Sequence, residues 1–207
     1  MDDRRRRRDL GRRVAALTHT DPRAIQGALY VAELSAACIG AESPSTSARE
    51  SAVTAATPVL RHPDLQAAVT RARGLHEGGV ELVAAAEELG TSGFVVHTVG
   101  LCTFVFLRFG AGPGPCLLAA IEAGGDTDTH AAIVGGWMGA LHGASLLPST
   151  AKLQSGPFGV AHLTGLADAL LSGEPPPAWS WSWALVRNLA LYPVVLGHGL
   201  SRLAFWY

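Results

Sequence analysis

Apolar residues recur at helical spacing along much of the chain. In residues 22–41 and again in residues 158–171 they lie three or four positions apart, which places them along one side of an α-helix. The first stretch carries Ile25, Leu29, Ala32 and Ala36, and the second carries Leu163, Leu166, Ala167 and Leu170. The pattern predicts a helix over each stretch, with its apolar side facing a core.

Polar residues mark where two helices begin. Asp21 followed by Pro22 predicts a helix start, because Asp accepts hydrogen bonds from free backbone N–H groups and Pro suits the first helical position. Ser47, with Glu50 three residues later, matches a capping box and predicts a helix that runs to about residue 60.

The most apolar run in the first half of the chain, residues 94–109, fits two structures. Its β-branched residues, such as Val95, Val96 and Val99, favour a strand by propensity. However, the run contains no turn signal and is long for a strand. We therefore predict a buried helix here.

A later apolar run, residues 131–143, is rich in glycine. Each glycine inside a helix costs about 1 kcal/mol relative to alanine. A helix that keeps Gly135, Gly136, Gly139 and Gly143 is expected to pack very closely against a neighbour.

Composition indicates one core-forming chain without a strong charge bias. Of 207 residues, 48% are hydrophobic and 16% are charged, and the net charge is −1, which gives no overall attraction to nucleic acid. The three cysteines, Cys38, Cys102 and Cys116, are widely spaced and form neither a disulfide framework nor a zinc pattern. The charged N-terminus lacks the apolar segment of a secretory signal, so we expect a cytoplasmic location.

The N-terminal residues 1–13 form a basic extension that contains the run Arg4 to Arg8. Such a run is an arm that binds an acidic partner or, more commonly, a solvated and partly disordered end. A start of translation inside a longer gene would also account for it. We expect the solvated end.

The stretch Gly124-Gly125-Asp126-Thr127-Asp128-Thr129 holds the strongest chemical signal in the chain. Its alternating carboxylate and hydroxyl oxygens suit a hard divalent cation such as Mg²⁺ or Mn²⁺. The same residues could instead cap the helix that follows them. The glycine pair before the stretch and the apolar helix after it favour the metal site.

This stretch, with Ala131-Ala132-Ile133 and Gly139-Ala140 after it, resembles the C-terminal signature of the ADP-ribosylglycohydrolase family. The resemblance implies an all-α fold, a multi-helix orthogonal bundle, over residues 14–172. It also implies metal-dependent hydrolysis of the N- or O-glycosidic bond that links ADP-ribose to a protein side chain or a small acceptor. Asp126, Asp128 and Thr129 would then be ligands of one or two Mg²⁺ or Mn²⁺ ions.

Two further segments extend the resemblance and add residues for substrate binding. The string from Thr18 to Arg23 is similar to a family segment whose histidine lies at the ADP-ribose pocket, which makes His19 a candidate. The string from Gly93 to Thr98 is similar to an element that lines the adenosine side, which adds Gly93 and Phe94. Gly125 in the central turn is a fourth candidate. His97 is a core histidine or a pocket residue, and the core role is favoured.

Two segments that complete the family's metal site are absent from this sequence. They are Gly-Asp-x-x-Gly and Thr-Asp-Asp, and both belong to the N-terminal part of family members, so the fold is expected to be N-terminally truncated. Without them no catalytic residue can be assigned. Hydrolysis would need a separate chain or an upstream reading frame, and the alternative is a catalytically inactive ADP-ribose-binding remnant or helical interaction module.

Residues 173–207 have a different composition, with a proline spacer and then an apolar, Trp-rich helix. Arg187, Asn188, Pro193 and His198 argue against a transmembrane span, although the length is close to one. Packing onto the chain's own bundle, or an interfacial or partner-binding helix, is expected instead. A similar tail closes one bacterial subset of the family.

Overall fold

A computed structural model describes residues 3–143 and 159–204 of the chain. The chain divides into two compact units, Met1–Pro148 and Ser149–Tyr207, and each is described by itself. The described residues form α-helices and one short 3₁₀-helix, without a strand, so the all-α prediction is confirmed.

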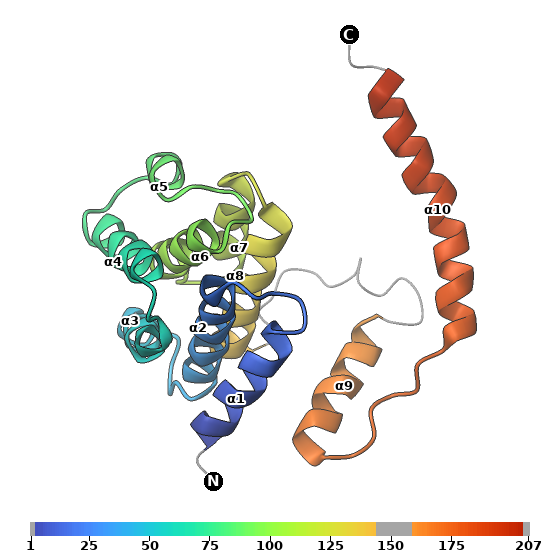
Figure 1. Cartoon of the computed structure of the whole chain (residues 1–207), viewed down its shortest axis with the longest axis horizontal. Coiled ribbons are helices and arrows are strands. Elements are labelled where there is room, and N and C mark those ends of the chain that lie inside the picture. Colours follow the sequence, from blue (N-terminus) through green and yellow to red (C-terminus); the bar gives the residue numbers. More distant parts are fainter. Residues whose placement is uncertain (1–2, 144–158, 205–207) are drawn as a thin grey trace. The chain divides into compact units, whose positions relative to one another are not determined.

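The first unit holds eight α-helices and the short helix η1 within its described residues (Figure 1). They are α1 (Asp3–Ala15), α2 (Pro22–Ile39), α3 (Thr46–Ala56), η1 (Thr57–Val59), α4 (Pro63–Glu77), α5 (Leu82–Leu89), α6 (Val95–Phe109), α7 (Pro113–Glu122) and α8 (Thr127–His142).

Helix α6 is the centre of this unit. It packs against α2, α3, α4, α5, α7 and α8, and most of its side chains are buried. Phe106 of α6 meets the buried ring of Trp137 of α8 edge to face, with 5.3 Å between the ring centroids. The apolar run is therefore a helix because neighbouring helices bury most of its apolar residues, which outweighs the strand propensity of its valines.

The two predicted helix starts differ in outcome. Asp21 caps α2 as predicted, since its side chain accepts a hydrogen bond of 2.8 Å from the backbone N–H of Arg23. The predicted cap at Ser47 is wrong: Ser45 caps α3, and its hydroxyl accepts from the N–H of Ala48. Two serines with the same chemistry lie two residues apart, and the earlier one begins the helix.

The basic N-terminal run forms helix α1, so the expectation of partial disorder is wrong, whereas most of its side chains are exposed, as expected of a solvated end. Helix α1 packs along α2. The guanidinium of Arg7 donates two hydrogen bonds, of 3.0 and 3.1 Å, to the carboxylate of Glu33, and Arg8 donates a third. Burial raises the pKa of Glu33, but these hydrogen bonds outweigh burial and hold that pKa below its ordinary value.

The glycines of α8 contribute unequally to packing. A Cβ atom on Gly135 would lie 3.2 Å from Leu117 of α7, so this glycine permits a close approach of the two helices. Gly136 faces open space, and the prediction of close contact is wrong for it.

The second unit contains α9 (Val160–Ser172) and α10 (Trp181–Ala204). Residue 158, where the first of these helices was expected to begin, lies outside the described residues. Gly173 ends α9 in a left-handed conformation, with φ 76°. No helix in the described part of the chain has the length and apolar character needed to cross a membrane.

Candidate active site

Four helices of the first unit begin at the same end of the bundle. Arg23 near the start of α2 contacts Asp64 at the start of α4 and Phe94, the residue before α6. Gly93, next to Phe94, lies against Asp126, the residue before α8. Because the N-terminal end of a helix carries partial positive charge, this end of the unit favours anionic groups.

The turn before α8 is shaped by two glycines. Gly124 and Gly125 have φ angles of +77° and +70°, a region that other residues rarely occupy. A Cβ atom on Gly125 would overlap the carbonyl oxygen of Thr91, and that oxygen accepts a 2.8 Å hydrogen bond from the N–H of Asp126. Gly125 thus fixes the position of Asp126 through its backbone.

The side chain of Asp126 does not cap α8. Asp126 occupies the N-cap position with φ −82° and ψ 61°, and its side chain makes no capping hydrogen bond. Its carboxyl group instead lies within hydrogen-bonding reach of Asp128. Asp126 therefore does not have the capping role that was the alternative to the metal site. Its carboxylate is available to bind a cation.

The carboxyl group of Asp128 is held in its ionised form. Hydrogen bonding to Asp126 is the largest cause of its lowered pKa, and the backbone N–H groups of Thr129 and of Asp128 itself add to it. Asp128 and Thr129 are exposed, whereas Asp126 is half-buried. The turn therefore presents two carboxylates and the hydroxyl of Thr129 at the start of a helix, and the half-buried Thr127 adds a second hydroxyl.

A buried histidine one turn after Asp126 was missed in the sequence. His130 is 1% exposed, and neither of its ring nitrogens has a hydrogen-bond partner among the described residues. Burial lowers the pKa of His130, against the opposing influence of Asp126 and Asp128. The imidazole is thus neutral near pH 7. Only its place in the Asp-Thr-Asp-Thr-His string could have indicated it.

Gly93 and Phe94 lie beside the carboxylates. A Cβ atom on Gly93 would be 2.8 Å from Oδ2 of Asp126. The ring of Phe94 is 41% exposed, with the guanidinium carbon of Arg23 5.1 Å from its centroid. The edge-to-face ring of His97 lies 5.3 Å from Phe94. Two neighbours therefore hold the ring while part of it stays open to solvent.

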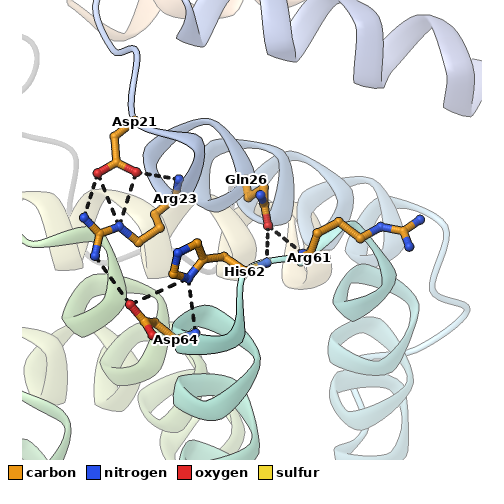
Figure 2. Close-up of polar contacts among 6 residues, drawn as sticks. All are labelled: Asp21, Arg23, Gln26, Arg61, His62 and Asp64. Atoms are coloured by element: carbon orange, nitrogen blue, oxygen red, sulfur yellow. Dashed lines mark hydrogen bonds and ion pairs between the residues drawn. The ribbon is translucent and has the colours of Figure 1, made fainter.

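Arg23 belongs to a charged cluster that joins α2 to α4 (Figure 2). It forms an ion pair of 2.8 Å with Asp21 and a longer one of 3.4 Å with Asp64, and His62 lies 3.6 Å from Asp64. Hydrogen bonds from Arg23 lower the pKa of Asp21 to about 2. The cluster was not predicted, because its members come from separate helices.

The two histidine candidates have local partners. His19 is exposed, and its Nδ1 lies 2.8 Å from the hydroxyl of Thr18, the residue before it in the chain. His97 is half-buried, and its Nδ1 lies 2.9 Å from the hydroxyl of Ser92. The contacts described above thus group Asp126, Asp128, Gly93 and Phe94, and they do not bring His19 into that group.

The donor set at the turn before α8 is small. The described residues contain no cluster of three or more His, Cys, Asp or Glu side chains that could hold a metal ion. The two carboxylates and the hydroxyls of Thr127 and Thr129 are therefore the side-chain oxygens that this turn contains.

A helical bundle with an oxygen-rich Asp-Thr-Asp turn at the head of α8 defines an all-α protein with a polar site at one end. The family model for ADP-ribosylglycohydrolases matches residues 1–178, and the chain belongs to this family. The match includes α1 and begins before residue 14, where the resemblance seemed to start from the sequence. No curated protein and no solved structure gave a significant match.

Proposed function

We propose that this chain carries part of a site that hydrolyses the glycosidic bond between ADP-ribose and a protein side chain or a small acceptor, with Mg²⁺ or Mn²⁺ held by Asp126, Asp128 and Thr129. Membership of the ADP-ribosylglycohydrolase family supports the reaction class. The observation that carries the metal site is the carboxylate of Asp126, which makes no capping bond and instead meets Asp128.

The donor chemistry fits a hard cation. Two carboxyl groups in contact repel each other when both are ionised, unless a proton or a cation lies with them. Carboxylate and hydroxyl oxygens are the ligands that Mg²⁺ and Mn²⁺ prefer.

A bound cation would supply Lewis-acid polarisation of a ribose hydroxyl or a water molecule. The chain's own residues would position the substrate around it. Gly93 lets a ligand approach Asp126 without meeting a side chain, and the open part of the Phe94 ring offers a surface on which an adenine base can stack. The convergent helix starts favour the negative diphosphate. His19 remains a candidate contact, and no general acid or base is assigned.

A second candidate is binding of ADP-ribose without hydrolysis. A divalent cation takes about six oxygen ligands, and the turn offers two carboxylates and two hydroxyls among the described residues. This small donor set favours a weakly held ion. A separate chain that supplies further carboxylates would restore a two-ion site.

Release of free ADP-ribose from an ADP-ribosyl-arginine peptide tests the proposal. The full chain is incubated with Mn²⁺ or Mg²⁺, and the product is measured by chromatography. If the chain is active alone, the wild type should release ADP-ribose and the Asp126→Asn/Asp128→Asn variant should release none. Glu122→Gln is the matched control, because Glu122 is an exposed carboxylate at the end of α7, close to the turn in sequence.

The result separates the two candidates. Metal-dependent release that the control retains and the double variant loses supports hydrolysis. Binding of ADP-ribose with no release of product by the wild type supports the binding module and overturns hydrolysis by this chain alone.

A further inference from the structure

A pocket lies in the first unit, between α1, the start of α2 and η1. Its volume is 330 Å³, at the lower end of the range of about 300–1,000 Å³ that is typical of ligand pockets. The pocket contains none of Asp126, Asp128, Thr129, Gly93 and Phe94 among its lining residues. It is therefore a separate feature from the candidate active site.

The polar lining of this pocket consists of hydrogen-bond donors. Arg8 and Arg12 come from α1, Arg61 follows η1, and Thr20 and Gln26 come from the start of α2. Among the described residues, no Asp or Glu lines it. Arginine donates and cannot accept, so a ligand here must bring acceptor atoms.

The orientation of Gln26 strengthens this donor character. Figure 2 shows the side-chain oxygen of Gln26 meeting the backbone nitrogens of Arg61 and His62, at 2.5 and 2.8 Å. Two N–H donors need an acceptor, which identifies this atom as the amide oxygen. The NH₂ group of Gln26 is then left as a donor, and it makes no hydrogen bond within the described residues.

The positive charge around the pocket is only partly balanced. Arg8 shares the single carboxylate of Glu33 with Arg7. Arg12 and Arg61 are exposed and have no acidic partner in the part of the chain that the structure describes. Three arginines thus line one concave site with an excess of positive charge, which attracts an anion.

The floor of the pocket is apolar. Leu29 and Val59, which are 4% and 8% exposed, lie there with Ile25. An inorganic ion alone would leave this surface uncovered. We propose that the pocket binds a small organic phosphate, with the phosphate group among Arg8, Arg12 and Arg61 and an apolar or aromatic group of the ligand on Ile25, Leu29 and Val59.

Calorimetric titration of the full chain with AMP tests this site, with adenosine as the matched ligand that lacks the phosphate. We expect AMP to bind at least about tenfold more tightly than adenosine, since charge-assisted hydrogen bonds to one phosphate are worth that much or more. Inorganic phosphate should displace AMP. Equal binding of AMP and adenosine, or no binding of AMP, overturns the proposal.

Variants locate the site. Arg12→Gln and Arg61→Gln change exposed side chains and should each weaken AMP binding about tenfold. Arg13→Gln removes the neighbouring exposed charge on α1 and should change the affinity less than twofold, because Arg13 does not line the pocket. An equal effect of Arg12→Gln and Arg13→Gln would mean diffuse attraction to the basic helix and would overturn the proposal.

Two more measurements distinguish this pocket from the candidate active site and from a nucleic-acid surface. Phe94→Ala should leave AMP binding intact; a loss that the arginine variants do not share would place AMP at the candidate active site and contradict the assignment. A single-stranded oligonucleotide is the fourth ligand. Tight binding of the oligonucleotide without binding of AMP would identify α1 as a nucleic-acid surface rather than the wall of a small-molecule pocket.

Discussion

The backbone of Gly93 lies directly against the carboxylate of Asp126. A Cβ atom at residue 93 would be 2.8 Å from Oδ2 of Asp126, closer than real side chains approach. Gly93 precedes α6 and Asp126 precedes α8, so this contact joins the starts of two helices. Asp126 can keep its position beside Asp128 only while residue 93 has no side chain.

Replacing Gly93 by Ala should therefore weaken divalent cation binding more than it affects folding. The added methyl group displaces the Asp126 carboxylate, and displacing a metal ligand through a neighbour costs about 10–100-fold in affinity. Gly93 is exposed and its φ angle is ordinary, so the free energy of unfolding should change by less than about 1 kcal/mol. Titration with Mn²⁺ and urea unfolding measure the two effects; unchanged Mn²⁺ affinity would show that the carboxylate position is unimportant.

Two other glycines should respond to Ala in opposite directions. Gly125 has a positive φ and no room for a Cβ beside Thr91, so Gly125→Ala should destabilise the chain by roughly 1–3 kcal/mol. Gly136 lies inside α8 with open space around it, so Gly136→Ala should stabilise the chain by up to about 1 kcal/mol. Urea unfolding measures both. Equal effects of the two substitutions would contradict the positions given to these glycines.

Because of the ion pair between Asp21 and Arg23, the stability of the chain should fall at low pH. The pKa of Asp21 is lowered from 3.8 to about 2, so its stabilising contribution is present above pH 4 and is lost as the pH falls toward 2. The melting temperature of the wild type should fall in this range more steeply than that of Asp21→Asn, which retains a side-chain oxygen for the helix cap. If the melting temperatures of the wild type and Asp21→Asn fell equally between pH 5 and pH 2, Asp21 would have an ordinary pKa in the folded chain.

The three cysteines should be unreactive in the folded chain. All are buried, and burial raises the pKa of Cys38 and of Cys116 to about 12 and that of Cys102 further. A thiol reagent at pH 8 should therefore modify none of them until urea is added, when three equivalents should react. Rapid modification of any thiol without urea would mean that the first unit opens readily.

The sequence predicted those parts of the fold that depend only on neighbouring residues, such as a helix cap. Asp21 with Pro22 indicated the start of α2 correctly, because a cap involves only neighbouring residues. Ser45 and Ser47 offered the same local chemistry, and the sequence could not rank them. The basic run also misled, because its order in α1 depends on the carboxylate of Glu33, 26 positions after Arg7.

In the candidate site, too, the sequence showed the features that come from neighbouring residues and not those that come from separate helices. The Asp-Thr-Asp turn was visible in the sequence because all of its oxygens come from consecutive residues. The contact of Arg23 with Phe94 and the burial of His130 were not visible, because they arise where separate helices meet. The roles proposed for His19, Gly125, Gly93 and Phe94 in substrate binding remain predictions.

Titration of the full chain with Mn²⁺ tests the central claim, that Asp126 and Asp128 form a cation site and not only a helix start. The wild type and Glu122→Gln should bind Mn²⁺ with similar affinity, and Asp126→Asn/Asp128→Asn should bind it at least about 100-fold more weakly, since both carboxylate ligands lose their charge. Equal Mn²⁺ affinity of the wild type and the double variant would contradict the claim.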